Sequence, residues 1–247
     1  MDAAIYEEMY KVEKRHWWFN ARRRILIFLL NRICDRSGYK SGEVKICDIG
    51  CGTGWVLEEL QEKYDAVGIE SDSHAIRFCR QRGVRVFEGE LPYALPFEGE
   101  SFDVVLLLDV LEHIDNDMAA VKEAIKLLKK GGILICTMPA YQCLWTRHDE
   151  LHHHRRRYNK KTAEHLLKSD QMEALKLSYY NFFLFPIAVV SRLVIRISKK
   201  NTLFEMKIPN SVVNVFLENV LASERFFIPY INFPLGLSLI YIGRKIV

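Results

Sequence analysis

The segment DIGCGTGW, residues 48–55, most narrowly restricts what this chain can fold into. It follows VKICDI, a short β-branched run typical of a buried strand, and it precedes WVLEELQEKY, whose apolar spacing is helical. Its glycines Gly50, Gly52 and Gly54 permit positive φ and let a ligand press against the backbone. The free N–H groups at the start of the following helix favour an anion. The segment therefore predicts a strand–turn–helix unit that binds a ligand at its turn.

The alternation of strands and helices continues along the chain, which predicts parallel pairing in a doubly wound sheet. In chain order, the further predicted strands span residues 66–70, 84–90 and 133–139, and residues 102–114 are predicted as a strand that runs into a turn and a helix. A helix is also predicted at 118–132. Residues 236–245 are typical of a last strand, with residues 176–183 as its antiparallel partner. We expect an α/β fold with a Rossmann-like seven-stranded sheet, mostly parallel with an antiparallel C-terminal strand, and helices on both faces.

A single domain is expected over residues 1–247, because no repeat or low-complexity linker divides a chain of this length. Within it we expect an N-terminal helical lid at 1–40, a ligand-binding core at 43–140, and a substrate-side insertion with the C-terminal strands at 141–247.

Acidic residues follow the predicted strands at the sheet edge where such folds bind their ligands. Asp48, Glu70, Glu90 and Asp109 all fall at the carboxyl ends of strands or just beyond them. At the tip of the second strand, the carboxylate of Glu70 can accept both hydroxyls of a ribose. Trp55 stands where a dinucleotide-binding turn has its third glycine, which disfavours a pyrophosphate across the turn. The pattern therefore predicts a nucleoside site.

Four motifs, in order and at workable spacing, resemble those of the class I S-adenosylmethionine-dependent methyltransferases. They are VKICDIGCGTGWVLEEL, AVGIESDSHAI, FEGELPYALPFEGESFDVVLLLDVLEHI and LLKKGGILICTMP, and the match covers Glu43 to Pro139. The resemblance implies a methyltransferase with S-adenosyl-L-methionine as cofactor and S-adenosyl-L-homocysteine as product. Because a sulfonium methyl is already activated, such an enzyme mainly aligns its acceptor, and it needs no metal. Carbon, oxygen and nitrogen acceptors all remain open.

The resemblance also implies which residues hold the cofactor. The implied set consists of Asp48, Gly50, Cys51, Gly52, Gly54, Glu70, Ser71, Glu90, Leu91, Asp109 and Val110. The glycine turn would wrap the methionine part of the cofactor, and Asp48 would order the turn from below. Glu70 would hold the ribose, while Glu90 and the backbone of Leu91 would meet the adenine. Asp109 and Val110 would line the methionine side near the methyl group.

The N-terminal segment EKRHWWFNARRR lies in a helical pattern that extends over residues 5–33. One interpretation is an amphipathic helix whose aromatic residues, Trp17, Trp18 and Phe19, pack on the sheet. The other is a lid in which the aromatics cover the cofactor and Arg22 or Arg23 pairs with its carboxylate. The phrase also resembles a bacterial and archaeal subgroup with HxWFxARRR at its start and HD...H.RRY after strand five.

The segment HDELHHHRRRYNKK, residues 148–161, leaves the fifth predicted strand at its carboxyl end, over the expected pocket. A metal site is not expected, because the consecutive His152, His153 and His154 cannot all point one way and no cysteine pair supports them. A short basic patch with one aromatic also suits nucleic acid. A further alternative is a solvated loop before a helix that is capped by Thr162.

We favour a fourth interpretation, in which this segment is the substrate-side wall of the pocket. His148 or His154 would act as a general base or hydrogen-bond partner, and Asp149 would orient an imidazole. Tyr158 belongs to the same candidate catalytic cluster. Arg156 and Arg157 would bind an anionic acceptor. His113, just after the fourth strand, is another candidate, with a packing role as its alternative.

The last third of the chain is rich in aromatic residues, and residues 186–222 should form helical cover. Its basic residues, Arg192, Arg196, Lys199 and Lys200, adjoin apolar faces. That composition suits a lid over an apolar substrate or a helix on a membrane surface, and ordinary core with basic edges is the alternative.

Charge and cysteine usage narrow the function classes further. The net charge of +4 is low for a protein built around nucleic acid, so we do not expect a nucleic-acid partner. The 6 cysteines show no paired spacing, which favours reduced thiols and a cytoplasmic protein with peripheral membrane contact as an option. We expect a methyl acceptor that is a small or lipid-linked metabolite. The alternatives are an RNA methyltransferase and a non-catalytic S-adenosylmethionine-binding subunit.

Overall fold

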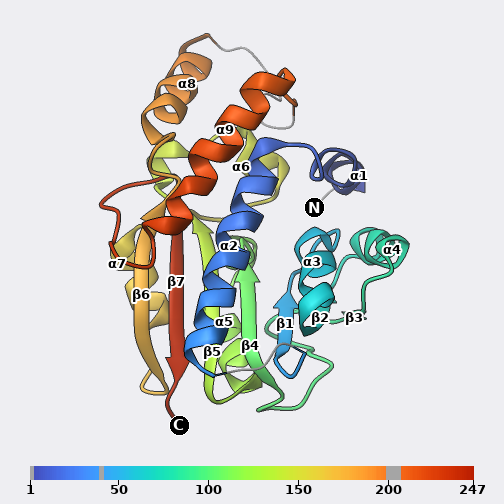
Figure 1. Cartoon of the computed structure of the whole chain (residues 1–247). Coiled ribbons are helices and arrows are strands. Elements are labelled where there is room, and N and C mark those ends of the chain that lie inside the picture. The colour runs from blue at the N-terminus through green and yellow to red at the C-terminus, as the bar shows by residue number, and fades with distance from the viewer. Residues whose placement is uncertain (1–2, 39–41, 199–206) are drawn as a thin grey trace.

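A computed structural model describes residues 3–38, 42–198 and 207–247, without the side chains of 193–198. Its centre is one sheet with the strand order β3-β2-β1-β4-β5-β7-β6 (Figure 1). The strands are β1 Lys45–Ile49, β2 Asp65–Glu70, β3 Val86–Glu88, β4 Phe102–Leu108, β5 Leu128–Pro139, β6 Met172–Tyr180 and β7 Ser238–Lys245. The pairs among β1 to β5 are parallel, and β7 runs antiparallel to both β5 and β6. The predicted Rossmann-like seven-stranded sheet is therefore confirmed.

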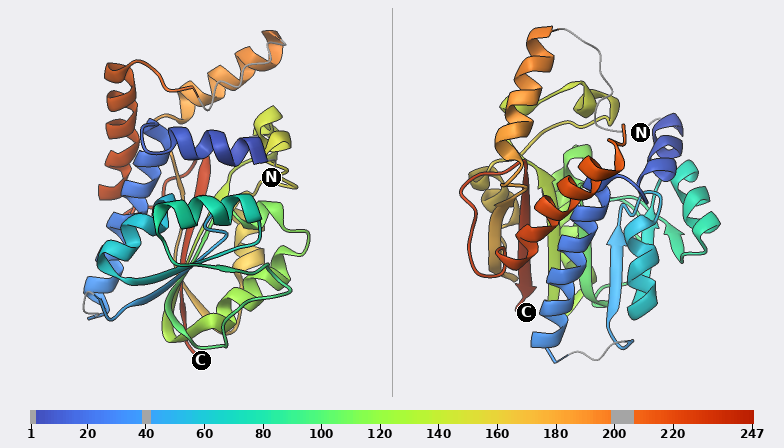
Figure 2. Two further views of the ribbon diagram at one scale, coloured as in Figure 1. Left: turned by 90° about the vertical axis from the view of Figure 1, so that its right-hand side faces the viewer. Right: turned by 45° about the horizontal axis from the view of Figure 1, so that its top comes forward.

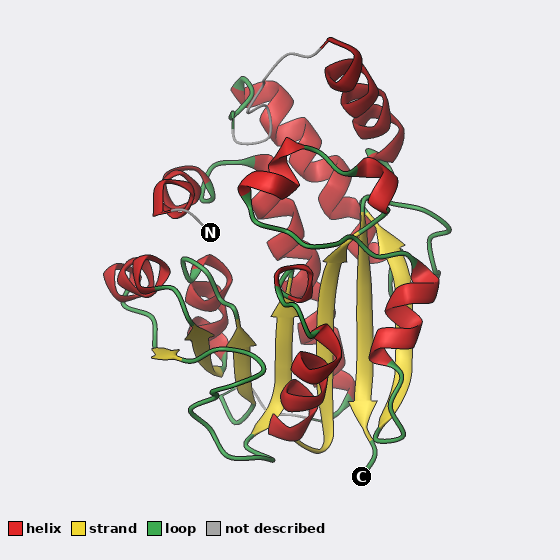
Figure 3. Cartoon of the chain, turned by 180° about the vertical axis from the view of Figure 1, so that it is seen from behind, coloured by secondary structure: helices red, strands yellow, loops and turns green. Residues whose placement is uncertain are grey.

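Helices cover both faces of the sheet and its carboxyl edge. The α-helices are α1 Ala3–Val12, α2 Trp17–Arg36, α3 Trp55–Lys63, α4 Ser73–Arg82, α5 Asp117–Leu127, α6 Arg147–Leu151, α7 Lys160–Leu167, α8 Phe185–Ser198 and α9 Ser211–Ser223. Short 3₁₀ turns lie at Leu111–His113, Gln142–Leu144 and Glu224–Phe226. Seen from behind, α5 and α7 lie on the sheet face opposite to α2 (Figure 3).

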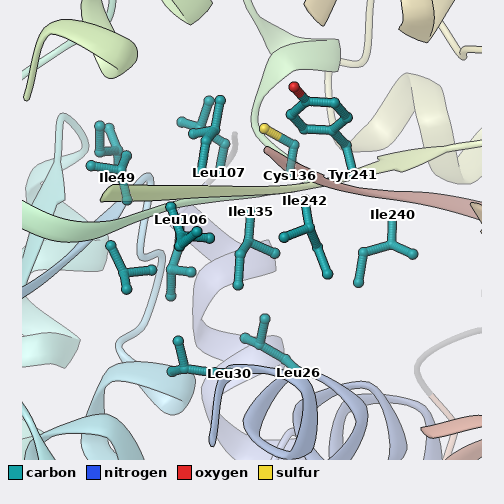
Figure 4. Close-up of a cluster of buried hydrophobic side chains, with 14 of the residues drawn as sticks. Leu26, Leu30, Ile49, Leu106, Leu107, Ile135, Cys136, Ile240, Tyr241 and Ile242 are labelled. Atoms are coloured by element: carbon teal, nitrogen blue, oxygen red, sulfur yellow. The ribbon is translucent and has the colours of Figure 1, made fainter. Parts of the chain in front are cut away.

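The two faces of the central strands are both buried, as the continuous apolar runs of β4 and β5 require. Side chains alternate along each strand, so Leu106 and Ile135 point towards α2 whereas Leu107 points to the other face (Figure 4). On the α2 side they meet Leu26 and Leu30. The body of α2 is thus core packing, in agreement with the first interpretation of the N-terminal segment.

The predicted N-terminal helix over residues 5–33 is divided in two. The chain leaves the helical path after Val12 and re-enters it at Trp17. His16 is the N-cap of α2, and its Nδ1 accepts a hydrogen bond from the backbone N–H of Trp18 at 3.2 Å. This cap lets α1 turn away and pack on α4, where Tyr10 stacks on Phe78 with ring centroids 4.6 Å apart (Figure 2).

Three other predicted boundaries also differ. The helix expected at 118–132 ends at Leu127, since Leu128 already pairs with Phe102 at the start of β5. The strand expected at 84–90 is the short β3. Thr162 is not the cap of α7, because Asn159 is the N-cap and its side chain accepts from the Thr162 N–H at 3.0 Å. Thr162 returns the contact through its hydroxyl, which accepts from the Asn159 N–H.

Helices α8 and α9 stand above the carboxyl edge of the sheet (Figures 1 and 2). They form the cover expected at 186–222, although the predicted basic residues Lys199 and Lys200 and the side chain of Arg196 lie outside the described residues. Asn214 of α9 accepts a hydrogen bond from the Trp17 N–H at 3.0 Å, which ties α9 to the start of α2. Within the described part of the chain, no helix combines the length and apolarity needed to cross a membrane.

Glu224 fixes the segment that joins β6 to α8, and its removal should destabilise the protein. Its buried carboxylate accepts backbone N–H bonds from Asn181, Phe182 and Phe183 at 2.6, 2.7 and 2.9 Å. Hydrogen bonds to charged groups contribute about 1.5–3 kcal/mol each, and unpaired buried donors are costly. Glu224→Ala should lower the free energy of unfolding by about 3 kcal/mol in urea titrations. Glu164→Ala, at an exposed position of α7, serves as the control, and an equal loss in both variants would contradict this assignment.

Candidate active site

A cavity of about 700 Å³ lies at the carboxyl ends of β1, β2, β4 and β5. Its volume is within the range of small-molecule sites. The floor is the glycine turn and the strand ends, the roof comes from α1 and α2, and one wall comes from the segment around α6. Side chains at the start of α8 and in α9, including Leu184, Ile187 and Leu217, close the upper part.

The glycine turn has the backbone that only glycine adopts easily. The φ angles of Gly50, Gly52 and Gly54 are 72°, 57° and 80°. A Cβ on Gly50 would come within 2.6 Å of Val110, so this glycine lets the turn pack on the loop after β4. A Cβ on Gly52 would meet no atom within 4 Å, and Gly52 lines the cavity. The turn therefore leaves room for a ligand at Gly52.

Glu70 is the residue that holds this turn in place. Its Oε2 accepts from the Gly52 N–H at 2.9 Å, and its Oε1 accepts from the N–H groups of Ser71 and Asp72 at 2.8 and 3.0 Å. Burial raises the pKa of Glu70, and these three donors oppose that shift. The carboxylate lines the cavity, where its remaining lone pairs can accept hydroxyl groups.

Asp48 lies under the same turn at the end of β1 and is 1% exposed. Its Oδ1 has no hydrogen-bond partner among the described residues. This atom therefore does not hold the glycine turn in place, which was the role predicted for Asp48. Burial, followed by the charge of Glu70, raises the pKa of Asp48 to about 7. A buried polar atom without a partner is costly, and a ligand that donates a hydrogen bond at this point would relieve the cost.

The roof is tied to the glycine turn by a buried charge network. Glu13, between α1 and α2, accepts from the Thr53 hydroxyl at 2.8 and 2.7 Å and pairs with Arg82. Arg82 also donates to the Thr53 carbonyl at 2.8 Å. The aromatic residues Trp17, Trp18 and Phe19 line the cavity from this roof. The body of α2 thus packs on the sheet, whereas the aromatic residues at its start line the cavity.

Both arginines expected to meet a cofactor carboxylate have protein partners. Arg22 lines the cavity and pairs with Asp109, and it also donates to the Tyr180 hydroxyl at 3.0 Å. Arg23 pairs with Glu59 and lies over the Trp55 ring, 4.1 Å from its centroid. Asp109 has a φ of 56°, an uncommon backbone conformation for this residue that is often found at functional sites.

Four histidines line one side of the cavity: His113, His148, His152 and His154. The expectation that three consecutive histidines cannot share one direction holds for His153, which lies outside the lining residues and has a φ of 57°. His153 follows the last turn of α6, and its left-handed backbone reverses the chain direction. The backbone N–H of His154 then donates to the carbonyl of Asp149 at 2.8 Å. His154 Nδ1 lies 2.8 Å from Asp149 Oδ1, which is the orienting contact predicted for this carboxylate. A catalytic role for these groups stays a prediction.

Asp149 does more than orient an imidazole. It is fully buried and forms a two-point pair with Arg157, with Nε–Oδ1 and Nη2–Oδ2 distances of 2.7 and 2.9 Å. Its Oδ2 also accepts from the Thr146 N–H in a capping box at the start of α6. The hydrogen bond from His154 and the nearby Arg157 hold the pKa of Asp149 below its usual range against the opposing effect of burial.

Several residues predicted for the site lie elsewhere. Tyr158 is buried in the core and donates to Asp117 at 2.8 Å, so it does not line the cavity. Arg156 also binds Asp117 and does not line the cavity. Arg157 does line the cavity, but its Nη1 donates to the Ala140 carbonyl and its other nitrogens bind Asp149. Gly54 stands behind the turn, where a Cβ would come within 2.9 Å of Val84.

Most of the residues that were predicted to hold the cofactor line the cavity. They are Asp48, Gly50, Cys51, Gly52, Glu70, Ser71, Glu90, Leu91, Asp109 and Val110 from the motifs, with Trp18 and Arg22 from the N-terminal segment. The open space at Gly52, the acceptor Glu70 beside it and the unpartnered Oδ1 of Asp48 together fit a nucleoside-bearing ligand with donor groups.

Burial, followed by the proximity of His154, lowers the pKa of His113 to about 4, so its ring is neutral at neutral pH.

Residues 47–136 match a protein family described as a methyltransferase domain. This segment is a methyltransferase domain. Among curated relatives, a ubiquinone biosynthesis O-methyltransferase from Roseobacter denitrificans is 34% identical over 100 residues, which is 38% of this chain and 40% of that protein. The chain therefore matches less than half of the length of this relative.

Solved structures agree with the fold of the methyltransferase domain. A SAM-dependent methyltransferase from Thermotoga maritima superposes with a TM-score of 0.60 at 19% identity, over 98% of this chain and 95% of that one. A geranyl diphosphate C-methyltransferase from Streptomyces coelicolor, solved with S-adenosyl-L-homocysteine, has a TM-score of 0.56 at 10% identity, over 83% and 74% of the two chains. The fold is thus that of the class I S-adenosylmethionine-dependent methyltransferases, as the sequence motifs predicted.

The sequence motifs missed other residues that line the cavity: His16, Glu112, Thr137 and Tyr180. Glu112 stands within DVLEHI, next to the predicted site residue His113, and its position in this motif after the fourth strand is the signal that the sequence offers for it. Tyr180 and Thr137 end β6 and β5, so they reach the site through strand pairing that the local sequence does not reveal.

Proposed function

We propose that this protein transfers a methyl group from S-adenosylmethionine to a small-molecule acceptor. The observation that carries the proposal is the open glycine turn, held by Glu70, at the base of a cavity of about 700 Å³. The turn leaves open space at Gly52 beside the carboxylate of Glu70, and both line the cavity, which suits the amino acid and ribose parts of the cofactor.

Different residues around the turn would bind the cofactor and exclude water from it. When bound, S-adenosylmethionine supplies a methyl group that its sulfonium already activates. Gly52 and Glu70 hold it on the floor, and Glu90 and Leu91 meet the adenine side. Trp17 and Trp18 exclude water from above, which favours transfer over competing reactions.

The histidine side of the cavity is where we expect the acceptor. His148 or His154 would accept a proton from the acceptor, and Asp149 holds the imidazole of His154 in one orientation. A base at this position serves an acceptor whose nucleophilic atom carries a proton, such as a hydroxyl or amine. The relatives named as O-methyltransferases favour the hydroxyl.

The upper part of the cavity supports a more specific acceptor, a lipid-linked or otherwise apolar metabolite. Leu184, Ile187 and Leu217 line it there, and Ile187 is 65% exposed. Further apolar side chains on α9, including Val212 and Phe216, are also exposed. A long apolar tail could leave the cavity along this path, and the same side chains suit peripheral contact with a membrane.

Label transfer from methyl-labelled S-adenosylmethionine tests the proposal. The protein is incubated with a metabolite extract, and the products are partitioned into organic, small aqueous and macromolecular fractions. We expect label in the organic fraction. Label in the small aqueous fraction would keep the methyltransferase and reject the apolar acceptor.

Two outcomes would reject the small-molecule proposal itself. Label in nuclease-sensitive material would identify an RNA methyltransferase. Cofactor binding by calorimetry without any transfer would indicate a non-catalytic subunit. A matched control uses protein with Glu70→Ala, which should transfer no label.

A further inference from the structure

We propose that Glu112, His113 and His154 form a binding site for a divalent transition-metal ion on the acceptor side of the cavity. The three residues come from two distant segments, the 3₁₀ turn after β4 and the loop after α6. One potential ligand atom from each lies within 4.8 Å of the others. All three residues line the cavity.

Glu112 is the first reason to expect an ion. Its side chain is completely buried at 0% exposure, and neither carboxylate oxygen has a hydrogen-bond partner among the described residues. Buried polar groups are normally satisfied, and an orphaned carboxylate at a cavity wall calls for an explanation. A cation would satisfy both oxygens at once. A purely structural glutamate would instead be expected to have protein donors, as Glu70 and Glu224 do.

The position of His154 is the second and independent reason. Asp149 binds its Nδ1 at 2.8 Å, which leaves Nε2 as the atom available to a ligand. A carboxylate behind a histidine is the usual arrangement around metal-ligating imidazoles, because it fixes the ring and raises its basicity. Asp149 is itself held by Arg157, so the whole support is rigid. The ring of His113 lies edge-on to that of His154, with centroids 4.7 Å apart.

The donor set defines the class of ion. Two imidazoles and one carboxylate suit Zn²⁺, Fe²⁺ or Co²⁺ rather than Mg²⁺ or Ca²⁺, which prefer oxygen donors alone. Metal–ligand bonds of about 2.0–2.2 Å place the donors of a tetrahedral ion about 3.3–3.6 Å apart. Since the three donors lie within 4.8 Å of one another and His154 is held by Asp149, binding would draw Glu112 and His113 towards His154. Three protein ligands leave coordination positions open, and these face the cavity.

The consequence for catalysis rests on the proposed function. An ion at this position would favour acceptors that bring an oxygen donor to it, and it would lower the pKa of a hydroxyl bound there. Because the ion would occupy Nε2 of His154 and Asp149 binds its Nδ1, the general base of the proposed function would then be His148. The metal site itself does not depend on that role, so it is tested without the methyl-transfer reaction.

Metal titration of the full chain tests the proposal. Protein treated with a chelator is dialysed and titrated with ZnCl₂ in a calorimeter, and with CoCl₂ while visible absorption is recorded. We expect one equivalent to bind to the wild-type protein. Glu112→Gln and His154→Gln should each weaken binding at least 10-fold, and Asp149→Asn should weaken it about 10- to 100-fold. His165→Gln, on the exposed side of α7, is the matched control and should bind as the wild type does.

Spectra and cofactor affinity make the outcomes distinct. Absence of binding, or equal binding by wild type, Glu112→Gln and His154→Gln, would overturn the proposal. An intense near-ultraviolet cobalt–thiolate band would also overturn it, because that band would place the ion on cysteines. Circular dichroism on each variant establishes that it is folded, and S-adenosylmethionine affinity is measured separately on the wild type. A wild type that binds metal but not S-adenosylmethionine would reject the proposed function and leave the metal site standing.

Discussion

Glu70→Ala should weaken S-adenosylmethionine binding at least 100-fold in calorimetric titrations. The substitution removes the expected acceptor for the ribose hydroxyls. It also removes the acceptor for the N–H groups of Gly52, Ser71 and Asp72, so the glycine turn loses the contact that holds its shape. Hydrogen bonds to charged groups contribute about 1.5–3 kcal/mol each, and two of them account for a 100-fold change in Kd.

Glu98→Ala is the control for this experiment, because Glu98 is an exposed acid in the loop before β4. Its affinity for S-adenosylmethionine should equal that of the wild type. A Glu70→Ala protein that is folded and binds with unchanged affinity would refute the assignment of this turn as the cofactor site. Circular dichroism on the same samples establishes that the variant is folded.

Asp149→Ala should lower the free energy of unfolding by about 3–5 kcal/mol, the largest effect on stability that we expect. The side chains of Asp149 and Arg157 are 0% and 3% exposed, so the substitution leaves a buried guanidinium without its counter-charge. The Thr146 cap and the His154 contact are lost as well. Urea unfolding followed by circular dichroism measures the difference.

The neighbouring pair of Arg155 and Asp115 provides the matched control. Arg155 lies in the same segment as Arg157 and pairs with Asp115 in the loop before α5, but the two side chains are 50% and 70% exposed. Exposed pairs contribute about 0–1 kcal/mol, so Asp115→Ala should change stability little. A double variant, Asp149→Ala with Arg157→Leu, should recover part of the loss because it removes the unpaired charge. A loss below about 1 kcal/mol for Asp149→Ala alone would contradict this account.

The floor of the cavity could be predicted from the sequence because every signal in it is local. A β-branched run, three glycines in five residues and a helical pattern lie within DIGCGTGW and its flanks. Glu70 follows at the tip of the next strand, and parallel strands bring their carboxyl ends to one edge of the sheet. The alternation of strand-like and helix-like apolar patterns along the chain predicted the sheet, and the apolar pattern of residues 236–245 predicted its last strand.

The histidine side of the cavity, in contrast, depends on contacts between distant segments. Arg157 and Tyr158 are adjacent to the histidines in sequence, yet they pair with Asp149 and Asp117 and belong to the structural support. Glu112 and His154 are 42 residues apart and meet only when the loop after α6 folds back over the end of β4. Side-chain type and spacing alone do not tell which charges in a polar segment are paired and buried. That is decided by tertiary packing, because the free energy of a buried charge depends on the partner that the fold brings to it.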